Sequence, residues 1–137
     1  MGISARFGVR IKDVRAAECT ADEAVGDWVC IVDDPPNGHD LVGKADPADF
    51  NRMPAVGVII SKSIPTMCLV QWFGETPDIF TGLSSGETYF LGSNSKIAEV
   101  PPVPTITKMF VQPIAVATAP TRVYVKAETN LTLRTPF

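Results

Sequence analysis

Residues 86–125 read GETYFLGSNSKIAEVPPVPTITKMFVQPIAVATAPTRVYV, and this stretch decides the fold class. Its apolar runs are short and are separated by glycine or proline, which leaves no room for a helix of ordinary length. Short runs rich in β-branched and aromatic residues, bounded by turn residues, are typical of strands. The stretch therefore predicts consecutive β-strands joined by turns in a compact all-β unit.

The composition of the whole chain is that of one folded domain. Its 137 residues are 45% apolar and have a mean hydropathy of +0.15, which is enough to build a core. The 12 prolines and 10 glycines recur between apolar runs, as they do in all-β proteins. We therefore expect a single antiparallel β-barrel or sandwich formed by residues 25–137, with an irregular N-terminal arm formed by residues 1–24.

The charge pattern limits the classes of partner. The net charge is −3, and the lysines and arginines are dispersed, whereas a nucleic-acid-binding face needs a basic cluster. No apolar run approaches the ~20 residues of a membrane span, and the N-terminal sequence lacks the pattern of a signal peptide. We expect no nucleic-acid or membrane partner and a chain that folds in the cytoplasm where it is made.

Three predicted hairpins account for most of the domain. They are residues 25–32 with 41–45, residues 55–61 with 66–73, and residues 111–119 with 121–127. Between them, residues 46–54 form a polar connection or a single helical turn, and residues 74–86 form a loop. Residues 88–91 add a strand that turns back to residues 96–100, and the prolines at 101–104 impose an extended crossing.

The second and third hairpins echo each other in sequence. Residues 56–61 resemble residues 114–119, and each segment is followed by a proline-containing turn and an apolar strand. Gly57 and Ala115 are small residues at equivalent places, which suggests close packing there. The echo predicts two similar hairpins that pack face to face or lie side by side in one barrel.

The N-terminal segment does not follow one period. Phe7, Val9 and Ile11 alternate with polar residues, as in a short strand, while residues 13–24 are rich in Ala, Glu and Asp and indicate a weak helix or an irregular arm. The arm is either a frayed terminus or a segment that becomes ordered only on a partner. Both interpretations remain open from the sequence.

Exposed apolar residues are the best sequence evidence for a binding role. Trp72 and Phe73 are adjacent on a predicted strand, so one should point into the core and the other outward, towards a subunit contact. Leu131 and Leu133 alternate in a tail that forms either an edge strand or a docking extension. The predicted partner contacts are Phe7, Val9, Ile11, Trp72, Phe73, Leu131, Leu133 and Phe137.

Catalytic and metal-binding patterns are weak. The only histidine, His39, follows an acidic, proline-rich turn whose spacing does not match a calcium loop, so a solvated turn is favoured over a cation site or a general base. Residues 84–86 lack the context of a nucleophilic serine. We predict no enzyme, no cofactor and no metal site. A small enzyme remains as an alternative class, which predicts a pocket that brings His39 together with Asp or Glu.

The cysteine pattern favours buried free thiols. Cys19, Cys30 and Cys68 are odd in number, have no C-x-x-C spacing and lie among apolar residues. These features favour free thiols over a disulfide or a metal site.

The order of motifs between residues 40 and 127 resembles a known family. The motifs are GKADPA (43–48), PAVGVI (54–59), VQWFG (70–74), GETYFLG (86–92), VPPVP (100–104), VQPIAVA (111–117) and VYV (123–125). In this order they look like the small β-barrel proteins that decorate or cement the capsids of tailed bacteriophages. Ala115 is a mild departure, because the pattern commonly has Gly there.

The resemblance implies a virion structural protein on the capsid surface. It would act as a homotrimer that bridges subunits of the major capsid protein, with the chain ends as arms that reach neighbouring subunits. The alternative is a head-fibre or tail-fibre module that binds a host receptor or glycan. That alternative predicts that aromatic and polar residues of the 74–86 loop line an exposed groove.

Overall fold

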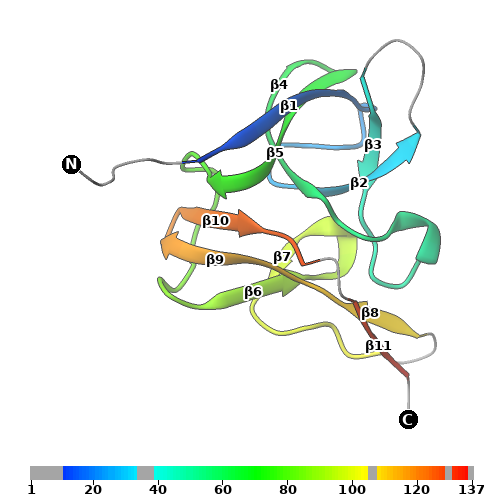
Figure 1. Ribbon diagram of the computed structural model, residues 1–137, viewed down its shortest axis with the longest axis vertical. Coiled ribbons are helices and arrows are strands. Elements are labelled where there is room, and N and C mark those ends of the chain that lie inside the picture. Colours follow the sequence, from blue (N-terminus) through cyan, green and yellow to red (C-terminus); the bar gives the residue numbers. More distant parts are fainter. Residues whose placement is uncertain (1–10, 34–38, 105–107, 129–130, 136–137) are drawn as a thin grey trace.

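The computed structural model describes residues 11–33, 39–104, 108–128 and 131–135, and within them the protein is all-β (Figure 1). Two 3₁₀ turns, η1 (Phe50–Arg52) and η2 (Ser93–Ser95), are its helical elements in these ranges. The strands are β1 (Asp13–Glu18), β2 (Trp28–Asp33), β3 (Leu41–Lys44), β4 (Gly57–Ile64), β5 (Met67–Glu75), β6 (Thr88–Leu91), β7 (Ile97–Ala98), β8 (Met109–Val111), β9 (Pro113–Ala119), β10 (Arg122–Lys126) and β11 (Thr132–Arg134).

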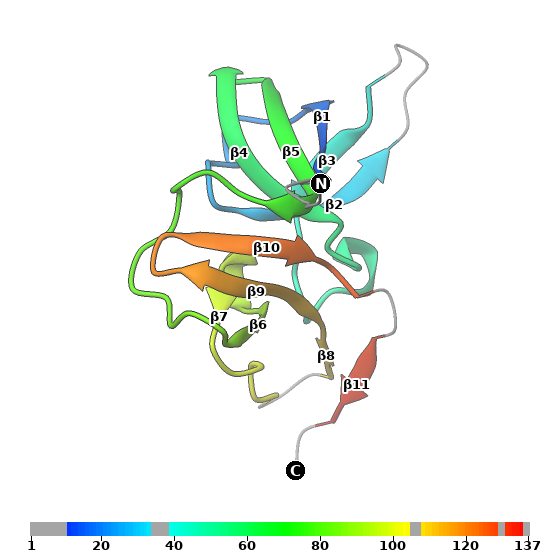
Figure 2. The same ribbon diagram turned by 60° about the vertical axis from the view of Figure 1, so that its left-hand side comes forward.

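Five strands close into a barrel, which confirms the predicted fold class. Their order is β1-β3-β2-β4-β5, and β1 also pairs with β5 to complete the circle. The sheet continues beyond β5 through β10, β9, β6 and β7, while β8 and β11 form a separate two-stranded ribbon. Figures 1 and 2 show the barrel at one end of the molecule, the β10-β9-β6 sheet beside it and the ribbon at the other end.

The barrel closes through one narrow contact. β1 and β5 pair along the whole of β1, whereas β1 and β3 are parallel and share one registered pair in the described residues, Glu18 with Leu41. The Glu18 N–H donates to the carbonyl oxygen of Asp40 at 2.8 Å. We call this contact the seam. All the other strand pairs of the described sheets are antiparallel.

Two apolar cores lie on either side of β2 and β4. The barrel core draws on all five barrel strands, with Val29 of β2 and Ile59 of β4 among its members. The neighbouring residues Trp28 and Val58 belong instead to the second core, which the β6-β9-β10 sheet covers. Because side chains alternate across a strand, β2 and β4 need apolar residues on both faces. This explains why residues 28–30 and 57–59 are continuously buried.

The 74–86 loop is anchored in the second core. Phe80 and Leu83 are buried there, and the Phe80 ring stacks on Trp28 with the ring centroids 6.5 Å apart. The loop backbone also bonds to the β9–β10 turn, since Phe80 N–H donates to Thr121 O at 3.0 Å. The fibre-module alternative placed an aromatic residue of this loop in an exposed groove, but its one aromatic side chain fills the core.

The N-terminal segment corrects the predicted arm. Residues 13–24 were expected to form a weak helix or an irregular arm, but Asp13–Glu18 is strand β1 of the barrel. The strand has a weak apolar signal, because Ala17 is the one residue of β1 that is buried in the barrel core and the others are partly or fully exposed. The following loop is also fixed, because Lys62 Nζ donates to the carbonyl oxygens of Thr20 and Glu23 at 2.9 and 2.7 Å. Residues 1–10 lie outside the described residues.

The two echoing hairpins are neighbours in one sheet, but β9 and β10 lie outside the closed barrel, so the predicted arrangement in one barrel is only partly correct. β4 pairs with β5, β9 pairs with β10, and β5 joins the hairpins through β10. A Cβ atom on Gly57 would overlap the backbone oxygen of Gln71, so only glycine fits at this crossing. Ala115, its equivalent, is buried in the second core.

Two buried polar side chains tie the strands together. Gln112, which is 0% exposed, accepts a hydrogen bond from Ala55 N at 2.9 Å and donates to the carbonyl oxygens of Ala55 and Glu128 at 2.8 and 2.9 Å. Asp27, also buried, accepts from Ala24 N at 2.9 Å and forms an ion pair with Lys96 of the β6–β7 turn. These groups join segments that are far apart in the sequence.

The prediction of buried free thiols is confirmed. Cys19, Cys30 and Cys68 are all buried and none forms a disulfide. Burial raises the pKa of Cys68 to about 12, with a further contribution from the neighbouring Cys19 thiol, and burial also raises the pKa of Cys30. The Cys30 and Cys68 thiols are therefore protonated at neutral pH and poorly nucleophilic.

Candidate interaction surfaces and a hollow at the seam

The predicted contact residues fall into three places. Phe73 packs on Tyr124 of β10, and the backbone of Ile11 lies against the adjacent Gly74. Trp72 lines a hollow at the seam, and Leu131 and Leu133 belong to the ribbon segment. The remaining three, Phe7, Val9 and Phe137, lie outside the described residues.

The first place is an exposed surface on β5, β9 and β10, which we call the apolar face. The Phe73 ring packs edge-on against Tyr124 with the ring centroids 5.3 Å apart, and Tyr124 is the registered partner of Val116. Ile11 is 66% exposed, and its carbonyl oxygen lies against Gly74. Gly74 has a φ of +93° and no room for a Cβ atom, so glycine is required where the chain crosses.

Tyr124 and Val116 were not predicted as contact residues. Both sit in strands that alternate buried and exposed positions, and both are exposed although they are apolar. The sequence signal was available, because Val116 lies between the small residues Ala115 and Ala117 that face the core. The identity of the exposed face becomes evident only once the pairing of β10 with β5 is known.

The second place is the ribbon patch, formed by Phe50, Phe110 and Leu133. The rings of Phe50 and Phe110 lie 4.9 Å apart, and Phe110 is the registered partner of Leu133. Phe50 is 59% exposed and Leu133 41%. A shallow hollow of about 490 Å³ lies beside Phe50, with Asp49 and Lys108 on its walls. Thr132–Arg134 is thus an edge strand, one of the two predicted forms of the tail.

Trp72 and Phe73 have different surroundings, but neither is fully buried or fully exposed. Trp72 packs against the barrel core, whereas Phe73 packs on Tyr124 at the apolar face. Both are half-buried, because a register shift between β1 and β5 at Asp13/Val14 interrupts the regular alternation. The simple prediction of one inward and one outward side chain is therefore only partly correct.

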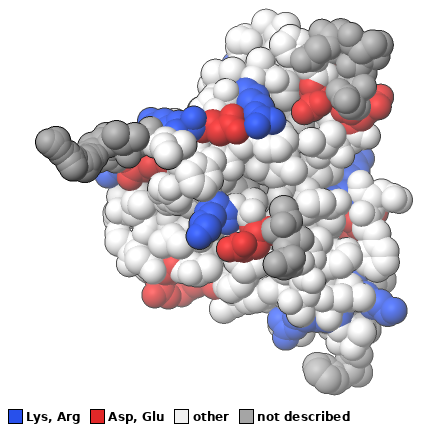
Figure 3. Space-filling view, viewed as in Figure 1, with Lys and Arg blue, Asp and Glu red and all other residues white. Residues whose placement is uncertain are grey.

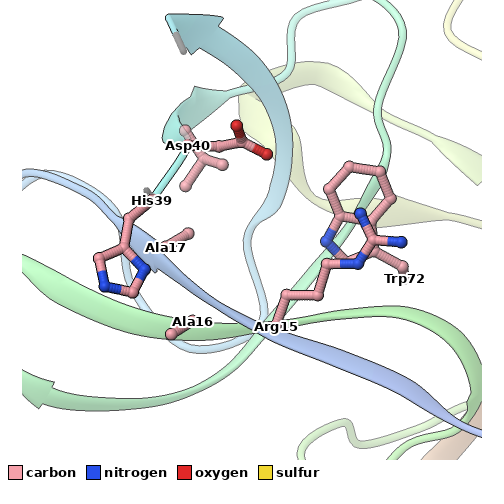
Figure 4. Close-up of a pocket in the computed structure, with 7 residues that line it drawn as sticks. Arg15, Ala16, Ala17, His39, Asp40 and Trp72 are labelled. Atoms are coloured by element: carbon pink, nitrogen blue, oxygen red, sulfur yellow. The ribbon is translucent and has the colours of Figure 1, made fainter. Parts of the chain in front are cut away.

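The third place is a hollow of about 370 Å³ at the seam (Figure 4). Arg15, Ala16 and Ala17 of β1 line it, together with His39, Asp40 and Val42 around the start of β3, and Trp72 of β5. Figure 4 shows Arg15 lying alongside Trp72 on one side and His39 on the opposite side. We call this feature the seam hollow.

Arg15 is fixed in place by two contacts. Its guanidinium carbon lies 4.2 Å from the centre of the Trp72 ring, in the arrangement of a cation–π contact. Asp13 accepts from Nε at 3.0 Å and from Nη2 at 2.8 Å. The hydrogen bond to Asp13 raises the pKa of Arg15, and the charges of Asp13 and Asp40 add to this effect. The guanidinium therefore remains charged and oriented.

His39 and Asp40 both line the seam hollow, but they are consecutive in the sequence, so their proximity is no test of the small-enzyme alternative. Catalysis needs more than this pair, because a general base works on a positioned substrate near a nucleophile or a stabilising group. Among the described residues, no serine, threonine or cysteine lines the hollow, and the three cysteine thiols are buried elsewhere. The polar side chains that do line it are groups that donate or accept hydrogen bonds.

Metal and charge features of the surface are sparse in the part of the chain that the structure describes. These residues contain no group of three or more His, Cys, Asp or Glu side chains placed to hold a metal ion. On the face seen in Figure 3, Lys and Arg side chains are scattered among uncharged ones and do not form one basic patch. No helix in the described ranges has the length and apolar character needed to cross a lipid bilayer.

Comparison with protein-family models, with curated proteins and with solved structures gave no significant match. The likeness to phage decoration proteins therefore rests on the sequence motifs alone, and the functional argument depends on the surfaces described above.

Proposed function

We propose that this protein is a virion structural protein that decorates a capsid and stabilises it by bridging subunits of the major capsid protein. The observation that supports this function is the presence of two separate exposed apolar surfaces. The apolar face lies on β5, β9 and β10, and the ribbon patch lies on η1 and on the ribbon of β8 and β11, which is at the end of the molecule away from the barrel (Figures 1 and 2). Exposed apolar clusters mark interaction sites on soluble proteins.

Each surface has a place in this proposal. The apolar face has two aromatic rings on a rigid sheet, which suits contact between copies of the chain in a homotrimer. The ribbon patch projects on a two-stranded element and suits attachment to the capsid. A protein that bridges subunits needs at least two such contacts.

Co-sedimentation tests capsid attachment directly. Shells assembled from the major capsid protein encoded in the same genome are mixed with the purified chain and pelleted. We expect the chain to pellet with the shells, Leu133→Asp to abolish this, and Thr132→Asp, an exposed neighbour on the same strand, to leave it unchanged. A chain that stays in the supernatant with intact shells would refute the proposal.

Analytical ultracentrifugation tests the trimer. The expected mass is three times that of the 14.7 kDa chain. Val116→Asp should give monomers, whereas Thr132→Asp, at an exposed position of the ribbon outside the apolar face, should stay trimeric. A wild-type monomer that binds no shell would favour the fibre-module alternative instead.

The alternative of a fibre module that binds a host receptor or glycan draws support from a different observation. The seam hollow combines an aromatic side chain with charged and polar groups at the surface. Such a hollow fits a small polar ligand better than a capsid protein.

A further inference from the structure

We propose that the seam hollow is a binding site for a neutral saccharide unit. This site is separate from the two surfaces assigned to the capsid and to the trimer, and it goes beyond the proposed decoration function. The argument rests on the size, charge and chemistry of the hollow.

The size of the hollow fits a small ligand. Its volume of about 370 Å³ lies near the lower end of the range of ~300–1,000 Å³ that small-molecule sites occupy. Ala16, Ala17 and Val42 supply small apolar walls, against which the C–H groups of a sugar ring can pack. Because the seam consists of one registered strand pair in the described residues, the hollow opens between β1 and β3 where the two strands separate.

The charge of the hollow selects a neutral ligand. The positive charge of Arg15 is already paired with Asp13 through two hydrogen bonds. Asp40 adds a carboxylate on the wall of the hollow. The local sum of these groups is negative, so a phosphate, a uronic acid or a sialic acid would face repulsion. A small cation in the hollow would lie close to the positively charged guanidinium of Arg15, which would repel it.

The polar groups match the needs of neighbouring hydroxyls. Asp40 supplies acceptor oxygens, and Nη1 of Arg15 is a donor that the bonds to Asp13 do not use. Hydroxyls both donate and accept, so a polyol can satisfy both groups at once. Hydrogen bonds to charged groups are the stronger ones, and Arg15 is pre-oriented by stacking on Trp72.

Nuclear magnetic resonance provides a test with an internal control. The chain has two tryptophans, and their indole N–H signals report on different places: Trp72 lines the hollow, whereas Trp28 is fully buried in the second core. The ¹⁵N-labelled chain is titrated with glucose, galactose, mannose and N-acetylglucosamine, and separately with glucuronate and inorganic phosphate. We expect at least one neutral sugar to shift the Trp72 signal saturably, with Trp28 unmoved and a Kd on the order of 1 mM.

Variants locate the binding. Asp40→Ala should weaken binding about tenfold, since it removes a hydrogen bond to the ligand. Asp49→Ala, in the hollow beside Phe50, should leave binding unchanged. The proposal is overturned if no neutral sugar shifts Trp72, if glucuronate or phosphate binds as tightly, or if Asp40→Ala binds like the wild type. Because no capsid enters this assay, its outcome is independent of the decoration test.

Discussion

Replacing Gln112 by leucine tests whether the fold depends on a buried polar tie between distant segments. The Gln112 side chain makes three hydrogen bonds of 2.8–2.9 Å, two with the backbone of Ala55 and one with the carbonyl oxygen of Glu128. Gln112 is 0% exposed and Ala55 is 1% exposed, so water does not replace the two bonds to Ala55 when the amide is removed, whereas Glu128 lies at the surface. Leucine fills a similar volume and therefore isolates the loss of the polar contacts.

The expected destabilisation follows from the groups left behind. Each hydrogen bond contributes about 1 kcal/mol net, and each buried backbone group that loses its partner costs about 1–3 kcal/mol. The N–H and the carbonyl oxygen of Ala55 are both buried and lose their partners, and the bond to Glu128 is also lost, which gives a total of roughly 3–7 kcal/mol. That is a large share of the ~5–15 kcal/mol that holds a domain of this kind together.

Urea unfolding followed by tryptophan fluorescence measures this loss. A slope of about 1–3 kcal/mol per molar urea means that the midpoint should fall by at least ~1 M. Thr118→Val, at an exposed position of β9, is the control and should change the unfolding free energy by less than ~0.5 kcal/mol. A Gln112→Leu midpoint equal to that of the wild type would show that the buried amide is not a structural tie.

Three further predictions follow from the packing and the thiols. Gly57→Ala should lower the unfolding free energy by about 1–3 kcal/mol in the same urea assay, because its Cβ atom would overlap the Gln71 backbone. A Gly57→Ala midpoint equal to that of the wild type would show that β4 has room for a Cβ atom at this position. Deleting residues 1–10 should preserve cooperative unfolding, whereas deleting residues 1–24 removes β1 and should abolish it; a cooperative 1–24 deletion, seen by circular dichroism, would contradict the closed barrel. Because the folded pKa of Cys68 is raised from 9.0 to about 12, the contribution of the protonated thiol to stability is complete below pH 9 and is lost as the pH rises towards 12. The fall in unfolding free energy over this pH range should be smaller in Cys68→Ala. Equal pH profiles for the two proteins would contradict this contribution of Cys68.

The strands that could be predicted from the sequence are those with a strong local signal. The hairpin of β4 and β5 was predicted because its β-branched and aromatic runs flank a proline-containing turn. β1 was missed because its segment, DVRAAE, has weak strand propensity and becomes a strand only by pairing with β5 along its whole length. Tertiary contact outweighs local preference in this strand, and no local pattern records it.

The candidate site was only partly predictable, because its residues come together through contacts between strands that are far apart in the sequence. Trp72 and Phe73 were singled out as adjacent aromatics, but their partners Arg15 and Tyr124 come from β1 and β10, more than forty residues away along the chain. The seam hollow depends on the parallel approach of β1 to β3, a pairing that periodicity does not reveal. His39 was identified from the sequence as a residue of interest. Its position near Arg15 and Trp72 could not be predicted, because these residues line one hollow only when the barrel is closed.

The position of Trp72 next to Phe73 links the two proposals. Trp72 lines the seam hollow and Phe73 belongs to the apolar face, so the hollow and the proposed trimer contact are separated by one step along β5. A trimer formed through the apolar face would therefore place three seam hollows beside its subunit contacts. Weak binding of single sugar units at three linked sites gives much tighter attachment to a surface that carries many such units. A decoration protein built in this way would combine capsid stabilisation with adhesion, and the two activities would depend on different residues.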